Sequence, residues 1–271
     1  MYQLLDSWER DAVVMDRATG TYADWRKVHP IHFEGQYFKV RGPLNTVPSP
    51  QGRPTFVQAG GSPRGRAFAA RHADSVIAPT STLKGVKEYR DAVRAHAEKC
   101  GRNPDDIKIL FLVYPTLAET TAEAREKHHR MVNEPWFIEA ALASAGTTSD
   151  IDFSEFSLDE PLHCKLTTNG EQGSLDRFQQ WGSGKTLRQL ASERFDNELD
   201  LIGTPEEVAD KMAAVMDYVG GDGFLISTPF QRTSRRFINE ICEGLVPALQ
   251  RRDLVREAYT QPTLRQTLRE F

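Results

Sequence analysis

The sequence predicts an α/β protein with parallel β-strands. Four short stretches rich in apolar, β-branched and aromatic residues have the composition of buried strands: residues 54–59, 75–78, 107–113 and 223–227. Segments with helical spacing of apolar residues, among them Leu83 to Lys99, alternate with these strands along most of the chain. The apolar run that contains the third strand extends from Ile107 to Leu117 and predicts a fully buried strand. Strands that alternate with helices pair in parallel and are joined by right-handed crossovers. We therefore expect about four parallel strands with helices between them.

Composition places the chain among ordinary globular proteins of the cytoplasm. Its 271 residues suffice for one large domain or two small ones, with 39% hydrophobic and 27% charged residues. The net charge of -4 argues against general nucleic-acid binding. Cys100, Cys164 and Cys242 are too far apart for a metal-binding cluster and are typical of free thiols in a reducing cytosol. No apolar run is long enough for a membrane span, and the N-terminus lacks the apolar core of a signal peptide.

Residues 54–73, PTFVQAGGSPRGRAFAARHA, predict an anion-binding turn between the first strand and the first long helix. Gly60 and Gly61 end the strand, Ser62 is a favoured N-cap, and Pro63 suits the first helical position. A helix that starts directly after a strand leaves several backbone N–H groups unpaired, and phosphate is their usual ligand. An ordinary turn between a strand and a helix has the same pattern, so both interpretations stay open at this point.

The segments before and after this region are less regular. Residues 11–28 are polar and predict irregular structure, whereas Ile31 to Val40 predict a β-hairpin. Residues 133–200 lose the alternation of strand and helix and predict an insertion, which in an α/β protein often forms a lid over the functional site. Six aromatic residues lie in this insertion: Trp136, Phe137, Phe153, Phe156, Phe178 and Trp181. These aromatic residues either line a substrate site or pack a small core of the insertion itself.

Two patterns that suggest ligand binding have simpler explanations. Residues 182–186, GSGKT, lack the first glycine of a nucleotide-binding P-loop, because Gln179 stands at that position and no apolar strand precedes it. His96 has the spacing of a packed or half-exposed helix residue. His128 and His129 are adjacent on a predicted helix and point about 100° apart, so we expect them at the surface rather than on one metal ion.

The C-terminal third returns to regular structure. Thr204, Pro205 and Glu207 form a capping-box pattern at the start of a helix, and a last helix is expected from about Thr233. A group of three basic residues lies beside that last helix start: Arg232, Arg235 and Arg236. We interpret this group as a solvated basic patch, with contact to an anion as the alternative.

Several sequence blocks carry a family resemblance. They read DSWERDA, HFEGQYFKVRGP, PSPQGRPTFVQAGGSPRGRAFAARHAD, LIGTPEEVAD and DGFLI, and together they extend over nearly the whole chain. In these blocks the chain resembles the bacterial luciferase-like monooxygenases, and within them the nitrilotriacetate monooxygenase and dibenzothiophene-sulfone monooxygenase subfamily. The resemblance implies a TIM-barrel-like fold, of which this chain would hold the C-terminal half, with the strands of the N-terminal half absent from it.

The resemblance also implies a cofactor, a reaction and partners. Enzymes of this family form two-component systems, in which a separate NAD(P)H-dependent flavin reductase supplies reduced FMN. They use O₂ to transfer one oxygen atom to a small organic substrate, and the insertion lies over the flavin. Transferred to this chain, the FMN phosphate would lie at Gly60, Gly61 and Ser62, with Gln58 and Arg64 as further contacts. A homo-oligomer is expected, and no catalytic residue can be assigned from the sequence.

Two other functions compete with this interpretation. The chain would be an inactive remnant, or a partial FMN- or phosphate-binding module, if the groups around the reactive part of the flavin are not supplied. A phosphosugar-type barrel enzyme would use a similar phosphate turn. The strand ends carry no candidate Schiff-base lysine or acid/base pair for that chemistry, so we rank this hypothesis last.

Overall fold

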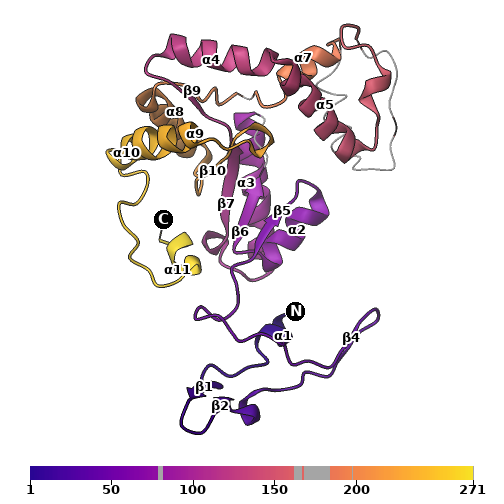
Figure 1. Ribbon diagram of the computed structural model, residues 1–271, viewed down its shortest axis with the longest axis vertical. Coiled ribbons are helices and arrows are strands. Elements are labelled where there is room, and N and C mark those ends of the chain that lie inside the picture. The colour runs from indigo at the N-terminus through magenta and orange to yellow at the C-terminus, as the bar shows by residue number, and fades with distance from the viewer. Residues whose placement is uncertain (79–81, 162–166, 168–183, 197, 271) are drawn as a thin grey trace. The chain divides into compact units, whose positions relative to one another are not determined.

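The computed structural model describes residues 1–78, 82–161, 167, 184–196 and 198–270 of the chain (Figure 1). These residues form two compact units. Unit 1 comprises Met1–Phe56 together with Thr260–Phe271, and unit 2 comprises Val57–Tyr259. Within the described residues, no helix has the length and apolar character needed to cross a membrane.

Unit 1 consists of short elements. In chain order they are α1 (Tyr2–Leu5), β1 (Val13–Asp16), β2 (Thr21–Ala23), the 3₁₀-helix η1 (Trp25–Lys27), β3 (Phe33–Glu34), β4 (Lys39–Val40) and α11 (Leu264–Leu268). The predicted hairpin at residues 31–40 is confirmed, since β3 and β4 pair antiparallel and the Gly35 N–H donates to the Phe38 carbonyl. The prediction of irregular structure for residues 11–28 was wrong, because β1 and β2 form a second hairpin there.

Unit 2 contains the predicted parallel sheet. Its strands are β5 (Val57–Ala59), β6 (Ser75–Ala78), β7 (Lys108–Val113) and β10 (Phe224–Ile226), in the spatial order β10-β7-β6-β5. All three pairings are parallel: Val57 lies opposite Ser75, Ser75 opposite Lys108, and Phe224 opposite Phe111. The four predicted strands are therefore confirmed, and three of them are one to three residues shorter at one or both ends than predicted.

Helices cover the sheet and complete the unit. In chain order they are α2 (Pro63–His72), α3 (Leu83–Lys99), η2 (Pro104–Asp106), α4 (Thr121–Asn133), α5 (Pro135–Ser149), η3 (Phe153–Glu155), α7 (Leu187–Ser192), α8 (Pro205–Val219), η4 (Pro229–Gln231), α9 (Arg235–Asn239), the π-helix η5 (Glu240–Leu245) and α10 (Val246–Gln250). Helix α2 lies beside β5 and packs against α3, which in turn contacts α8 (Figure 1). The main core joins the sheet to these helices through fully buried side chains such as Val76, Phe111 and Val208.

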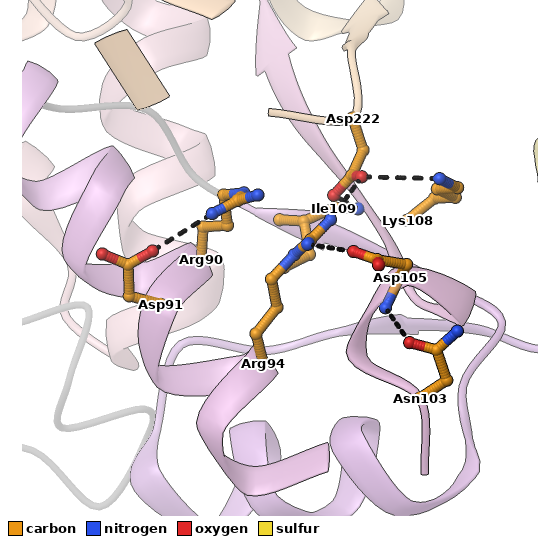
Figure 2. A network of polar contacts seen from close by, with 8 residues as sticks. All are labelled: Arg90, Asp91, Arg94, Asn103, Asp105, Lys108, Ile109 and Asp222. Atoms are coloured by element: carbon orange, nitrogen blue, oxygen red, sulfur yellow. Dashed lines mark hydrogen bonds and ion pairs between the residues drawn. The ribbon is translucent and has the colours of Figure 1, made fainter. Parts of the chain in front are cut away.

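A charged network joins β7 and β10 at their amino ends (Figure 2). Asp222 precedes β10, and its side chain is only 4% exposed. Its carboxylate accepts hydrogen bonds from Arg94 Nη2 at 2.9 Å and from the Ile109 N–H at 3.0 Å, and Lys108 Nζ lies 3.7 Å away. Asp105 forms a further ion pair with Arg94 at the surface. These contacts stabilise the amino end of the sheet. Ligands of parallel α/β sheets bind at the opposite, carboxyl end.

Three regions of unit 2 contain detail that the sequence did not show. The apolar run from Ile107 to Leu117 is not one strand, because after β7 it continues as β8 (Thr116–Leu117), which pairs in parallel with β9 (Ile202–Gly203). The last helix runs without a break from Arg235 to Gln250, but its middle six residues, η5, have π-helical rather than α-helical hydrogen bonds. The insertion is largely helical where it is described, with α5 and α7 packed against each other.

Candidate functional site

The turn between β5 and α2 has the predicted helix start. Strand β5 ends at Ala59, and α2 begins at Pro63 with Ser62 as its N-cap. Ser62 has extended backbone angles, and its Oγ accepts the hydrogen bond of the Gly65 N–H at 3.1 Å. Because β5 is a strand of the parallel sheet, the turn lies at the carboxyl end of that sheet.

Two side chains hold the carbonyl groups of this turn. The Tyr89 hydroxyl, on α3, donates to the Gly60 carbonyl at 2.6 Å. Arg66 Nε donates to the Gly61 carbonyl at 2.9 Å, and its guanidinium lies 4.7 Å from the centre of the Tyr89 ring. Burial raises the pKa of Tyr89, and the charge of Arg66 partly opposes that rise. The hydroxyl therefore stays protonated and remains a donor over the physiological pH range.

The fixed carbonyl groups determine where the N–H groups of the turn point. In a trans peptide unit the C=O and the N–H point in opposite directions. The N–H of Gly61 therefore points away from Tyr89, and the N–H of Ser62 points away from Arg66. Among the residues that the structure describes, the N–H groups of Gly61, Ser62 and Arg64 have no hydrogen-bond acceptor. Such donors at a helix N-terminus suit an anion.

The space around the turn fits a phosphate group. A Cβ atom built on Gly61 would meet no atom within 4 Å, so a ligand can approach this backbone closely. A Cβ atom on Gly65 would lie 3.2 Å from Ser62 Oγ, which is close enough to disturb the N-cap. Glycine at position 61 therefore lets a ligand reach the backbone, and glycine at position 65 preserves the Ser62 N-cap.

The predicted FMN contacts lie together but differ in availability. Gly60, Gly61 and Ser62 form the turn itself. Gln58 is next to it on β5, but its Nε2 donates at 2.8 Å to the Ala59 carbonyl rather than to the open side of the turn. Arg64 is exposed in the first turn of α2. The roles of all five residues in FMN binding stay predictions.

Sequence reasoning missed Tyr89 and Arg66 at this turn. Tyr89 has the helical spacing of a core residue, and it is in fact only 4% exposed. The hydrogen bond of its hydroxyl cannot be predicted from the sequence, because its partner, the Gly60 carbonyl, lies 29 residues earlier in the chain. Arg66 lies within the recognised motif, but only the structure shows that its guanidinium turns back to the Gly61 carbonyl.

A cluster of aromatic side chains lies beyond the carboxyl ends of β7 and β10. Its closest ring pairs are Tyr114 with Phe195 at 4.7 Å, Phe195 with Phe230 at 4.9 Å, and Phe137 with Phe230 at 5.1 Å between ring centres. Trp136 borders Phe137 at 5.6 Å. Tyr114 follows β7, Phe230 follows β10, and the other three residues belong to the insertion. We call these five residues the aromatic cluster.

The chain segment that places Phe230 in the cluster has unusual backbone geometry. Phe230 and Gln231 both have left-handed conformations, with φ of 53° and 56°. Such a conformation costs about 1–3 kcal/mol in a residue with a bulky side chain and persists only where packing holds it. Thr228, at the start of the same segment, is 8% exposed, and its hydroxyl has no hydrogen-bond partner among the described residues. Phe230 packs against a small buried cluster of Ile138, Ala141 and Ala191, which supplies compensating contacts.

The other aromatic residues of the insertion have structural roles where they are described. Phe153 is 3% exposed and packs with Leu187 and Leu190 in a small separate core, which Phe156 borders. Phe178 and Trp181 lie outside the described residues.

The weaker motifs behave as structural elements. Thr186 caps α7 through a capping box with Gln189, so the GSGKT segment ends in an ordinary helix start; Gly182 and Ser183 lie outside the described residues. His96 is half-buried, and its Nδ1 contacts the Ala92 carbonyl at 2.7 Å. His128 is not simply at the surface as predicted, since it is 17% exposed and lies 3.1 Å from Asp196. No group of His, Cys, Asp and Glu side chains suited to a metal ion occurs within the described part of the chain.

Comparisons with known proteins agree on one family. The family profile described as "Luciferase-like monooxygenase" matches residues 14–223. The N-acetyl-S-(2-succino)cysteine monooxygenase of Bacillus subtilis (strain 168) is 33% identical over 278 residues, covering 97% of this chain and 60% of that protein. Nitrilotriacetate monooxygenase component A of Aminobacter aminovorans is 33% identical over 275 residues, covering 99% of this chain and 60% of that protein.

A solved structure extends the similarity to the fold. The crystal structure of riboflavin lyase with modified FMN and riboflavin has a TM-score of 0.80 and 32% identity, covering 99% of this chain and 59% of that chain. This chain thus spans about three fifths of the length of the relatives it matches. The resemblance read from the sequence blocks is confirmed, and so is the luciferase-type α/β fold with four parallel strands. The chain belongs to the luciferase-like monooxygenase family.

Proposed function

We propose that this chain belongs to a two-component FMN-dependent monooxygenase and that the turn after β5 binds the FMN phosphate. The observation that carries this proposal is the set of N–H groups at Gly61, Ser62 and Arg64 without an acceptor in the described structure. The contacts of Tyr89 and Arg66 with the neighbouring carbonyl groups orient the first two of these N–H groups away from those side chains. Related proteins are monooxygenases, and a similar structure contains modified FMN. Together these facts support FMN over an unspecified phosphate.

The residues of the turn would perform three tasks. The backbone N–H groups of Gly61 and Ser62 would donate to phosphate oxygens, and the start of α2 would add its favourable dipole. Tyr89 and Arg66 would keep these donors oriented before the cofactor arrives. Reduced FMN, when bound, supplies the electrons that allow one atom of O₂ to enter the substrate while the other leaves as water. Gln58 and Arg64 are proposed as additional phosphate contacts.

The proposed partners follow from the reaction. A separate NAD(P)H:flavin reductase would supply the reduced FMN, and the name "component A" of the nitrilotriacetate relative supports a system of more than one component. A small organic molecule would be the substrate, and a homo-oligomer the assembly. The insertion at residues 133–200 would cover the flavin, as the aromatic contacts between it and the ends of β7 and β10 suggest.

Comparison of FMN with riboflavin tests the phosphate site directly. Riboflavin lacks only the phosphate, so its binding measures the contribution of the ring part alone. Hydrogen bonds to a charged group contribute about 1.5–3 kcal/mol, which corresponds to about 10- to 100-fold in Kd. We expect this preference for FMN in fluorescence titrations of oxidised flavin, and in anaerobic titrations of the reduced form.

Two serine N-caps provide matched variants for this titration. Ser62→Ala removes the cap at the turn, and Ser234→Ala removes an equivalent cap on α9, whose Oγ accepts from the Phe237 N–H at 3.1 Å. The Ser62 variant should lose part of the preference for FMN over riboflavin, because loss of the cap loosens the first turn of α2 that places the N–H donors, and the Ser234 variant should keep it. Equal affinities of the unchanged chain for FMN and riboflavin would refute the phosphate site. Binding of FMN without O₂-dependent product formation in the presence of a flavin reductase would favour the alternative of an FMN-binding module.

A further inference from the structure

The segment after β10 occupies a favourable place for substrate recognition. In parallel α/β folds, ligands bind at the carboxyl ends of the strands. The FMN-phosphate turn follows β5, and residues 228–232 follow β10 at the other edge of the same sheet. Three strand spacings separate β5 from β10, which is roughly 14 Å. A molecule bound near residues 228–232 would therefore lie at the same end of the sheet as the flavin.

Arg232, at the end of this segment, lies over an aromatic ring. Its guanidinium carbon lies 4.4 Å from the centre of the Trp136 ring. Stacking engages the face of the guanidinium and leaves the N–H donors at its edge available for a carboxylate or a similar planar anion. Arg232 is exposed and forms no ion pair within the described residues. Its neighbour Arg236, in contrast, pairs with Glu240 at 2.8 Å.

The support beneath Arg232 is rigid. Trp136 packs against Phe137, and Phe230 lies in edge contact with both of them. Phe137 is fully buried, and Phe230 is fixed in its left-handed conformation by the insertion core. An arginine on such a support loses less conformational entropy on binding than one on a free side chain. The interpretation of Arg232 as part of a solvated basic patch therefore does not account for its setting.

We propose that Arg232 binds an anionic group of the substrate, so that the substrate class is an organic carboxylate or sulfonate. The apolar part of such a molecule would contact the exposed edge of Trp136, which is half-buried. This inference rests on the proposed monooxygenase function, because it assigns the substrate of that site. It makes Arg232 a specificity-determining residue and gives Trp136 and Phe230 positioning roles.

A pair of small probes tests the proposal independently of activity. Hexanoate carries a carboxylate on an apolar chain, and hexanamide is its neutral counterpart of nearly the same shape. We expect isothermal titration calorimetry of the full chain to show hexanoate binding at least 10-fold more tightly than hexanamide. Arg232→Gln should abolish this preference, whereas Arg235→Gln should retain it, since Arg235 is also exposed but has no aromatic support in the described structure. Trp136→Leu should weaken hexanoate binding several-fold while the charge remains.

Several outcomes would overturn the proposal. Equal binding of the two probes, or no binding of either, would exclude an anion site here. Equal losses in the Arg232 and Arg235 variants would assign the effect to a diffuse basic patch. The FMN-to-riboflavin preference is measured on the same variants and should be unchanged by Arg232→Gln. If the unchanged chain shows no preference for FMN over riboflavin, the FMN-phosphate site is refuted. The comparison of hexanoate with hexanamide still tests the anion site at Arg232 in that case.

Discussion

Removal of the Asp222 carboxylate should destabilise unit 2 more than any exposed ion pair of the chain. Asp222 joins two strands, since it directly precedes Gly223 and β10 and binds Arg94 and the N–H of Ile109 on β7 (Figure 2). Its side chain is 4% exposed, while those of Lys108 and Arg94 are 9% and 17% exposed. Solvent therefore cannot replace the carboxylate when it is removed.

The magnitude follows from burial. Loss of one partner of a buried ion pair costs about 3–5 kcal/mol, because the remaining charge stays buried without compensation. Asp222→Ala leaves Arg94 with Asp105, whose side chain is 70% exposed and therefore contributes little. It also leaves the Ile109 N–H without its acceptor. We expect a loss of about 3–5 kcal/mol in the free energy of unfolding. For a unit of about 200 residues this corresponds to a decrease in Tm of roughly 6–20 °C.

Thermal unfolding followed by circular dichroism measures this loss. Asp105→Ala is the matched control, because it removes the other carboxylate on Arg94 from an exposed position, and it should cost less than about 1 kcal/mol. Asp222→Asn covers the case in which the alanine variant does not fold. Its side-chain oxygen can still accept from the Ile109 N–H, so its loss should lie between those of the other two variants.

The reasoning would be refuted if Asp222→Ala and Asp105→Ala lost the same small amount. That result would mean that Arg94 and Lys108 reach water after the substitution and that burial of the network does not determine its energy. A loss in Asp222→Asn equal to that in the alanine variant would instead assign the whole effect to charge, with no contribution from the backbone hydrogen bond.

Three further predictions concern single contacts. Tyr89→Phe should lower the free energy of unfolding by about 1 kcal/mol in urea, since the Gly60 carbonyl loses its donor, and Tyr218→Phe at an exposed site should not. Because burial raises the pKa of Tyr89, the stabilisation by its hydroxyl should be complete below pH about 10, the ordinary tyrosine pKa. It should decline as the pH rises through the higher pKa of the folded state, so the unfolding free energies of the unchanged chain and of Tyr89→Phe should converge there. A difference between them that stays constant with pH would contradict this. Thr204→Ala should cost about 1 kcal/mol by removing the cap of α8, and an unchanged Tm would contradict the capping role. Phe111→Ala should cost about 3–5 kcal/mol by opening a cavity in the main core, and a loss below about 1 kcal/mol in urea would contradict its place there.

Elements with local signals at both ends were predicted closely. Strand β6 and helix α3 have the predicted bounds, Ser75–Ala78 and Leu83–Lys99. Pro79 follows the strand, and Thr82 caps the helix through its hydroxyl. The helix then ends before Gly101, which has a positive φ. In such segments the start and stop depend on neighbouring residues, which the sequence shows directly.

Elements that depend on distant partners were missed or misplaced. Helix α5 has no distinct apolar face in its sequence, since apolar and small residues surround it, although one side of it packs against two clusters of the insertion. Its helical period is therefore invisible in the sequence. The run from Ile107 to Leu117 is mostly apolar, yet Pro115 lacks an N–H for the sheet, and β8 pairs instead with β9 far along the chain. Strand β1 is mostly exposed, so it shows no alternation either.

The candidate site likewise has local features, which the sequence predicted, and features that depend on distant residues, which it did not. The N-cap, the helix start and the free N–H groups at Gly61 and Ser62 are local features, and the motif predicted them. The orientation of those groups depends on Arg66 and on Tyr89, and Tyr89 reaches the turn because α3 packs against α2. The difference matters for the proposed function. A glycine turn in isolation offers donors in many directions, and a phosphate would have to organise them at an entropic cost.

The same reasoning separates the two interpretations of Arg232. From the sequence, three arginines close together predict a solvated patch, since charge is all that the sequence shows. The structure distinguishes them by their neighbours: Arg236 has a carboxylate, whereas Arg232 has the face of Trp136, contributed by a helix almost a hundred residues earlier. A guanidinium stacked on an aromatic ring keeps its charge and the N–H donors at its edge, but its side chain has fewer accessible conformations. These properties favour selective binding of an anion over a role in solubility alone. Aromatic support at a strand end, rather than the number of basic residues, is therefore the feature that identifies an anion-binding arginine in this protein.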